Sequence, residues 1–135
     1  LHPTKRYKNM SNENFFYDVV AKTDSSLTGF ANTTSINDSG LVALIGKYGA
    51  VQDLLVGDGS SPLKNLSSDF SLNTSFASGV EINNNNEVVA VDRQSNGMSG
   101  VRLWDANQPG TFKKNIAISK YLATNTYQVF KNILI

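Results

Sequence analysis

Residues 35–44 read Ser-Ile-Asn-Asp-Ser-Gly-Leu-Val-Ala-Leu, and residues 82–90 read Ile-Asn-Asn-Asn-Asn-Glu-Val-Val-Ala. The two stretches align at a constant offset of about 46 residues, and the Phe-Ala pairs that precede them, at Phe30 and Phe76, align at the same offset. The segments that follow also match, because each contains a second apolar stretch, a turn with Asp and Pro, and a third apolar stretch. Self-similarity at a fixed spacing is the signature of a tandem repeat.

Tight turns are predicted at equivalent positions of the two units. Asn-Asp-Ser-Gly is a β-turn sequence whose last position favours a positive φ, and Gly40 adopts such a φ without steric cost. Asn86 stands at the equivalent position of the second unit, and Asn is the next most tolerant residue for left-handed geometry. Gly40 and Asn86 are therefore predicted to be structural turn residues.

Continuous apolar runs follow both turns, at Leu41–Ile45 and Val88–Val91. They are too short for an ordinary helix and rich in β-branched residues, which predicts strands that are buried on both faces. We predict an all-β fold in which antiparallel strands form propeller-like blades, with repeat units at about residues 30–75 and 76–121. A β-sandwich is the alternative. A short helix is compatible only with residues 116–124.

One domain is the expectation for 135 residues. Residues 1–14 are predicted to form a polar, mobile segment, and residues 15–135 a single all-β repeat domain. The run at 15–21 is typical of the last strand of a preceding unit. The run at 127–135 is typical of a strand that pairs either with the N-terminal run or with a neighbouring molecule. Because the sequence starts at Leu1, we expect a processed form or a piece of a longer protein.

Composition excludes several classes of function. Twelve Lys and Arg against eleven Asp and Glu give a net charge of +1, so no nucleic-acid partner is expected. The absence of Cys excludes disulfides, thiol nucleophiles and cysteine-based zinc sites. No apolar run reaches the roughly 18 to 20 residues that cross a bilayer, so no transmembrane segment is expected.

Catalysis finds little support among the titratable residues. His2 is the single histidine and lies in the polar N-terminal segment, which disfavours a Ser-His-Asp triad. A pair of carboxylates could cleave glycosides, and Asp53, Asp58, Asp92 and Asp105 all fall near predicted strand ends. Turn capping is the ordinary role of such residues, so we predict no enzyme and keep a hydrolase as the third hypothesis.

A weak candidate for a metal site lies at the two equivalent turns, where Asn37, Asp38, Asn83 and Asn84 carry side-chain oxygens. No calcium-loop spacing is present, and the Asn run carries no charge. A turn whose backbone is satisfied by these side chains is the simpler interpretation. No cofactor is therefore assigned, and calcium remains an alternative.

Aromatic residues offer a possible stacking surface for sugars or bases, with Trp104, Tyr48 and Tyr127 as its candidates. Trp104 aligns with an apolar residue of the first unit, Val56. Packing in the hydrophobic core is therefore the favoured interpretation for Trp104.

The turn motif in both units resembles the I-N-[ND]-x-G-x-V-A-F repeats of bacterial, often cyanobacterial, secreted propeller-like proteins. The resemblance covers about residues 15–118. The chain departs from the motif at Leu44 and Val91, which replace the usual aromatic residue, and at Asn86, which replaces Gly. The resemblance implies an extracellular or cell-surface module of β-propeller type, without established catalytic residues.

These observations predict a non-catalytic, extracellular structural or protein-interaction module. Propellers close with about 4 to 8 blades, and this chain supplies fewer than three units of the predicted size. We therefore expect association with copies of itself or with another protein, through open strand edges. The alternative is a lectin-like module that binds carbohydrate or calcium.

Overall fold

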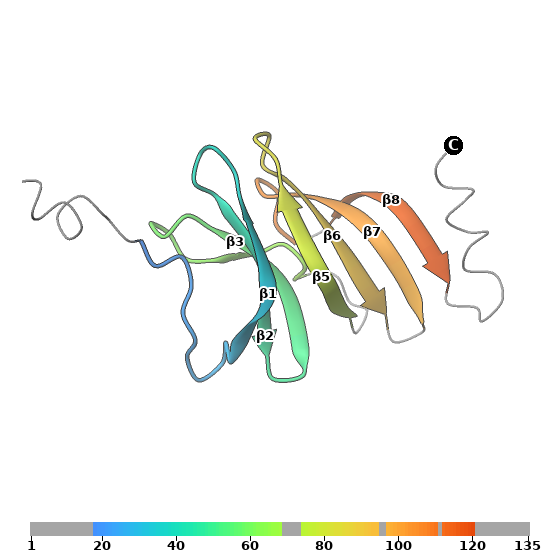
Figure 1. Cartoon of the computed structure of the whole chain (residues 1–135), viewed down its shortest axis with the longest axis horizontal. Helices are drawn as coiled ribbons and strands as arrows, with labels where there is room; N and C mark the ends of the chain where they lie inside the picture. The colour runs from blue at the N-terminus through green and yellow to red at the C-terminus, as the bar shows by residue number, and fades with distance from the viewer. Residues whose placement is uncertain (1–17, 69–73, 95–96, 111, 121–135) are drawn as a thin grey trace, which may run out of the picture.

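The computed structural model describes residues 18–68, 74–94, 97–110 and 112–120 (Figure 1). Within these ranges the chain forms β-strands and no helix. In the same ranges, nothing helical is long and apolar enough to cross a membrane. The predicted N-terminal segment with His2 and the strand-like run at 127–135 with Tyr127 lie outside the described residues.

The first sheet is an antiparallel meander in which each strand pairs with the next one along the chain. Its order is β1-β2-β3-β4, and its strands are β1 (Gly29–Ile36), β2 (Val42–Tyr48), β3 (Val51–Gly57) and β4 (Lys64–Asn65). The register of β1 against β2 shifts between Phe30 and Thr34.

The second sheet repeats this order as β5-β6-β7-β8. Its strands are β5 (Thr74–Ile82), β6 (Glu87–Gln94), β7 (Met98–Asp105) and β8 (Phe112–Lys120). The register of β5 against β6 shifts between Phe76 and Val80, at the same place in the sheet as the shift in the first one.

The prediction of an all-β fold with antiparallel sheets is confirmed. Both four-stranded sheets are open, and the described strands close neither a barrel nor a propeller. The helix considered for residues 116–124 is wrong for its described part, because residues 116–120 belong to β8. A strand at 15–21 is likewise wrong for residues 18–21, which are described and have no strand pairing.

The two sheets pack against each other, with β1 and β5 side by side between them (Figure 1). Apolar residues of both sheets form one core, in which Ile45, Leu54 and Trp104 have no exposed surface. The remaining buried members of this core are Ala43, Val56, Leu66, Phe76, Val80, Ile82, Val88, Ala90 and Ala106. Burial of these side chains is the main term that stabilises the pair of sheets.

The opposite face of the first sheet is covered by the segment that precedes β1. Leu27 packs there against Leu44 and Leu55. Gly46 allows this close approach, because a Cβ at Gly46 would lie 2.6 Å from Leu55 Cδ1 and 2.9 Å from Leu27 Cδ1. Strand β2 is therefore buried on both faces, as its continuous apolar run predicted.

Strand β6 differs from β2, because only one of its faces is buried. Val88 and Ala90 point into the core between the sheets, whereas Val89 and Val91 alternate with them and are half-buried. The prediction that residues 88–91 would be buried on both faces is therefore wrong. The apolar run is continuous in both strands, but no described strand or segment packs over the second face of β6 as Leu27 does over β2.

Candidate functional site

The turns that join β1 to β2 and β5 to β6 have the same backbone geometry. Gly40 N–H donates to Asn37 O at 3.0 Å, and Asn86 N–H donates to Asn83 O at 3.1 Å. The last residue of each turn lies in the left-handed region, with φ of 84° at Gly40 and 60° at Asn86. Gly and Asn both tolerate the left-handed region, so neither turn is strained.

Each turn is stabilised internally by the side chain of its first residue. Asn37 Oδ1 accepts the backbone N–H groups of Ser39 and Leu41 at 3.2 and 3.0 Å. Asn83 Oδ1 accepts the equivalent groups of Asn85 and Glu87, both at 2.9 Å. An Asn side chain that accepts hydrogen bonds from its own turn favours that turn over extended backbone.

The two turns also bond to each other, position by position. Asn37 Nδ2 donates to Asn83 O at 3.1 Å and to Asn86 Oδ1 at 2.8 Å. Asn84 Oδ1 accepts the backbone N–H of Asp38 at 2.9 Å, and Asn84 Nδ2 donates to Asp38 Oδ2 at 2.8 Å. The structure thus joins five of the six residues that the sequence singled out at these turns, and Gly40 bonds within its own turn.

The same pairing continues along the strands, between residues 46 or 47 positions apart. Ser35 Oγ donates to Glu81 Oε2 and accepts the backbone N–H of Ile82, both at 3.1 Å. Gly79 N–H donates to Thr33 Oγ1 at 3.0 Å, across a separation of 46 residues. We call these contacts, together with those of the turns, the inter-sheet ladder.

The inter-sheet ladder also protects an edge of the second sheet. Strand β5 has no neighbouring strand on its outer side among the described residues. Three of its backbone N–H groups donate to side-chain oxygens of the first sheet: Phe76 to Gln52 at 2.6 Å, and Gly79 and Ile82 to the hydroxyls named above. This edge therefore has fewer free donors for a further strand.

Sequence reasoning missed Thr33, Ser35, Gln52 and Glu81 as members of the ladder. Thr33 and Ser35 have partners on β5 at the repeat spacing, so a search for polar residues about 46 positions apart would have found them. Gln52 carries no such signal, because its partner Phe76 lies 24 residues away.

The side-chain oxygens of the calcium candidates already accept hydrogen bonds. Those of Asn37 and Asn83 accept from their own turns, and those of Asp38 and Asn84 accept from the opposite turn. Asp38 is the one carboxylate among the four. Calcium takes six to eight oxygen ligands, usually with several carboxylates. Among the described residues, no group of three His, Cys, Asp or Glu side chains is arranged to hold a metal ion.

Glu87, directly after the second turn, has a charged neighbour. Lys113 Nζ lies 2.8 Å from Glu87 Oε2, and Asn83 Nδ2 donates to Glu87 Oε1 at 3.0 Å. The Lys113 ammonium, followed by the Asn83 amide, holds the pKa of the Glu87 carboxyl below its usual range. The same ion pair raises the pKa of Lys113.

The four Asp residues considered for hydrolysis each have a structural partner. Asp58 Oδ1 accepts the backbone N–H and the hydroxyl of Ser60, and these bonds lower the pKa of Asp58. Asp105 Oδ1 accepts the backbone N–H of Asn107 at 2.9 Å. Asp53 Oδ1 accepts the hydroxyl of Ser67 at 3.2 Å. Asp58 and Asp105 therefore stabilise their own turns, and Asp53 binds a side chain of the turn after β4.

Asp92, the fourth of these residues, is completely buried and forms an ion pair with Arg102. Arg102 also donates to Asn115 Oδ1, and its guanidinium lies 4.9 Å from the centre of the Phe112 ring. Gly100 leaves room for it, because a Cβ there would lie 2.9 to 3.1 Å from the Arg102 guanidinium. This network is a satisfied structural core rather than a reactive pair.

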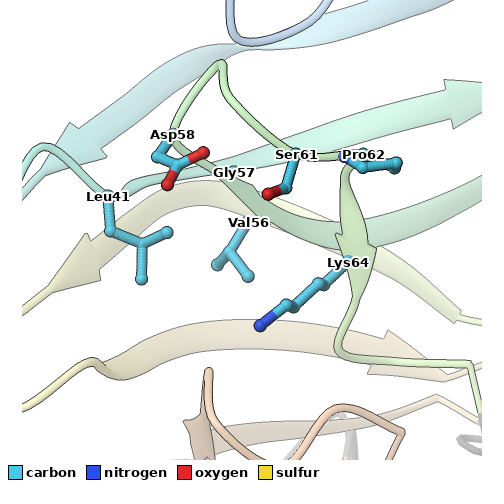
Figure 2. A pocket seen from close by; sticks show the side chains of 7 residues that line it. All are labelled: Leu41, Val56, Gly57, Asp58, Ser61, Pro62 and Lys64. Atoms are coloured by element: carbon cyan, nitrogen blue, oxygen red, sulfur yellow. The ribbon is translucent and has the colours of Figure 1, made fainter.

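A small cavity lies beside the connection from β3 to β4 (Figure 2). Its volume is about 80 Å³, and Lys64 and Asp58 reach it from opposite sides. Pockets for small-molecule ligands are usually about 300 to 1,000 Å³, so this cavity is too small for a sugar ring. A wider hollow of about 430 Å³, at the end of the β6–β7 hairpin, borders residues 95–96, which lie outside the described part.

The side chain of Asn86 provides a test of the ladder. We expect Asn86→Gly to lower the free energy of unfolding by about 1 kcal/mol, because the turn keeps its φ but Asn37 loses an acceptor. Asn86→Ala should cost about 1 kcal/mol more, from the left-handed backbone. Asn86→Asp, which keeps an acceptor, is the matched control. Urea unfolding measures all three, and a Gly variant as stable as the wild type contradicts the prediction.

Comparison with known proteins returns no matching family model, no matching curated protein and no matching solved structure. The inter-sheet ladder, the core and the faces of the sheets are therefore the basis for a function.

Proposed function

We propose that the chain is a non-catalytic structural or protein-interaction module, built from tandem β-repeat units of propeller type, that acts by associating with copies of itself or with another protein. The observation that carries this proposal is the inter-sheet ladder. Its turn contacts join Asn37 to Asn83 and Asp38 to Asn84, which stand 46 positions apart. Contacts at a constant separation are what stacked repeat units produce, since each unit touches its neighbour through equivalent positions.

The two open sheets give the same proposal a physical basis. A repeat unit buries its apolar faces by stacking against neighbours, so a face that no neighbour covers is available to a partner. The half-buried Val89 and Val91 on the outer face of β6 fit that description. The sheet edges are a second route: β1 and β8 are long outer strands without a paired neighbour on one side among the described residues.

A non-catalytic role agrees with the chemistry of the described residues. Each of the four candidate carboxylates already binds a structural partner: Asp58 and Asp105 bind their own turns, Asp53 binds the Ser67 hydroxyl and Asp92 pairs with Arg102. The turn motif resembles that of secreted bacterial repeat proteins. We therefore propose that the module acts outside the cell or on its surface.

The mass in solution tests this proposal. We expect light scattering on a size-exclusion column to give more than the 14.7 kDa of one chain, with a mass that rises over about 1 to 100 µM protein. If self-association is absent, capture of a partner protein has to replace it. A compact monomer that binds neither itself nor any extracellular protein contradicts the proposal.

A lectin-like module that binds calcium or carbohydrate is the second candidate. One observation favours it: oxygen-bearing side chains of both turns, Asp38 and Asn84 among them, meet at one exposed place. Because their oxygens already accept hydrogen bonds, we expect calcium and its chelator to leave the melting temperature unchanged. A calcium-dependent rise that Asp38→Asn abolishes would favour this candidate over the first. Asp58→Asn, at an exposed turn elsewhere, is the matched control.

A further inference from the structure

Four apolar side chains form a continuous patch on the outer face of the second sheet. Val89 lies directly opposite Leu103, and Val91 lies directly opposite Val101, on the paired strands β6 and β7. All four are half-buried and point away from the core that contains Trp104. We call these four residues the open face.

The first sheet shows what such a patch does when it is covered. There, Ala43 lies opposite Val56 and Ile45 lies opposite Leu54, in the same cross-strand arrangement. Val89 and Val91 follow Ala43 and Ile45 by 46 positions. The four residues of the first sheet are at most 1% exposed, because the second sheet packs on them. Among the described residues, no sheet covers the open face in the equivalent way.

Building on the proposed self-association, we infer that the open face binds the open face of a second copy of this chain, about a two-fold axis. Such an interface is isologous, so it closes at a dimer and leaves no further copy of the patch uncovered. Two sheets that pack face to face in this way form an ordinary aligned or orthogonal sandwich.

Head-to-tail stacking, in which the open face receives the first sheet of another copy, is disfavoured by two observations. The outer face of the first sheet already packs against Leu27 of its own chain. In addition, Asn37 Nδ2 of the first sheet donates to Asn86 Oδ1 of the second sheet. Gly40 is the residue of the first sheet that is equivalent to Asn86, and it has no side chain that could accept this hydrogen bond. A copy docked head to tail would therefore lose a hydrogen bond of the ladder and have to displace its own cover.

The test combines mass in solution with charge placed in the open face. Wild-type chain should reach a limiting mass of twice 14.7 kDa over about 1 to 100 µM. Val101→Glu should raise the dimer dissociation constant at least about a hundredfold, because it buries two unpaired carboxylates. Val51→Glu, at an exposed position of β3, is the matched control and should dimerise like wild type. Circular dichroism verifies that both variants fold.

A near-isosteric variant keeps the test decisive if Val101→Glu fails to fold. The chain has no cysteine, so Val101→Cys introduces a single thiol into the open face. Its alkylation should slow at least about tenfold as the protein passes from monomer to dimer, whereas the thiol of Val51→Cys should react at a constant rate.

The outcomes separate this inference from the proposed self-association. A wild-type dimer that survives Val101→Glu and leaves the Val101→Cys thiol unprotected overturns the open face as the interface, but leaves self-association standing. A polymer without a limiting mass overturns the two-fold arrangement. A wild-type chain that is monomeric at every concentration overturns both the open face as the interface and the self-association. If the Val101→Cys thiol is also unreactive in that monomer, the same chain covers the open face.

Discussion

Arg102→Met should lower the free energy of unfolding by about 3 to 5 kcal/mol, because it leaves the Asp92 carboxylate buried without a counter-charge. Asp92 has no exposed surface, and its other side-chain donor in the described network is Gln94 Nε2 at 3.4 Å, a long hydrogen bond. A domain of this size is stable by about 5 to 15 kcal/mol, so the loss is a large fraction of the total. Urea unfolding followed by circular dichroism measures it.

The double variant Asp92→Leu with Arg102→Met is the informative control for this pair. Both charges are then replaced by apolar groups, and the stability should return to within about 1 kcal/mol of wild type or exceed it. Arg93→Met, on the opposite face of β6 and exposed, should change stability by about 0.5 kcal/mol at most. A single Arg102→Met variant as stable as Arg93→Met would contradict the prediction.

Trp104→Ala should also destabilise the protein by about 3 to 5 kcal/mol. Trp104 is completely buried, and its ring makes an edge-to-face contact with Phe112 at a centroid distance of 5.7 Å. Truncation removes this contact and opens a cavity between the sheets, which the strands on either side can fill only in part.

Trp104→Phe separates the cavity from the aromatic contact. It should cost less than the Ala variant, because most of the ring volume stays. Ile36→Ala, at a side chain that is 65% exposed, should be nearly neutral and is the control for a generic loss of apolar surface. Because the chain has a single Trp, circular dichroism follows the unfolding of all four proteins. A loss below about 1 kcal/mol for Trp104→Ala would contradict the packing described here.

The sequence correctly predicted the features that depend on neighbouring residues of the chain, namely turns and strands. Turn residues such as Gly40 and Asn86 were identified from their tolerance of a positive φ, and the apolar runs after them located β2 and β6. Whether a run is covered on one face or both was not predictable, because β2 and β6 carry similar runs. The second sheet covers one face of β2 and Leu27 covers the other, whereas among the described residues only the face of β6 toward the first sheet is covered.

The alignment of the two units was wrong by one residue in their second strands. Trp104 was matched with Val56, but the strand pairing places Trp104 opposite Val88 and Gly57 opposite Val42, so Trp104 corresponds to Gly57. The prediction that Trp104 belongs to the core was nevertheless correct. Leu54, Leu55 and Val56 are consecutive apolar residues, so the sequence pattern leaves the register open by one residue.

Asp92 shows how a candidate site changes when the register is known. From the sequence it was one of four Asp residues near strand ends, without an evident partner. The β6–β7 hairpin pairs Asp92 with Gly100, and Arg102, two residues further along β7, then lies on the same face and diagonally across from Asp92. The ion pair follows from that register and from the missing side chain at Gly100.

The meander order of the two sheets has a consequence for how the chain folds. Every strand pairs with the strand next to it in sequence, so each hairpin closes only a short loop. The long-range step is the docking of one finished sheet on the other, through the ladder and the shared core. Contacts of small sequence separation favour rapid formation of the hairpins, so we expect docking of the sheets to limit the rate of folding. Substitutions within the ladder should therefore act chiefly on the rate of unfolding, and substitutions within a hairpin on the rate of folding.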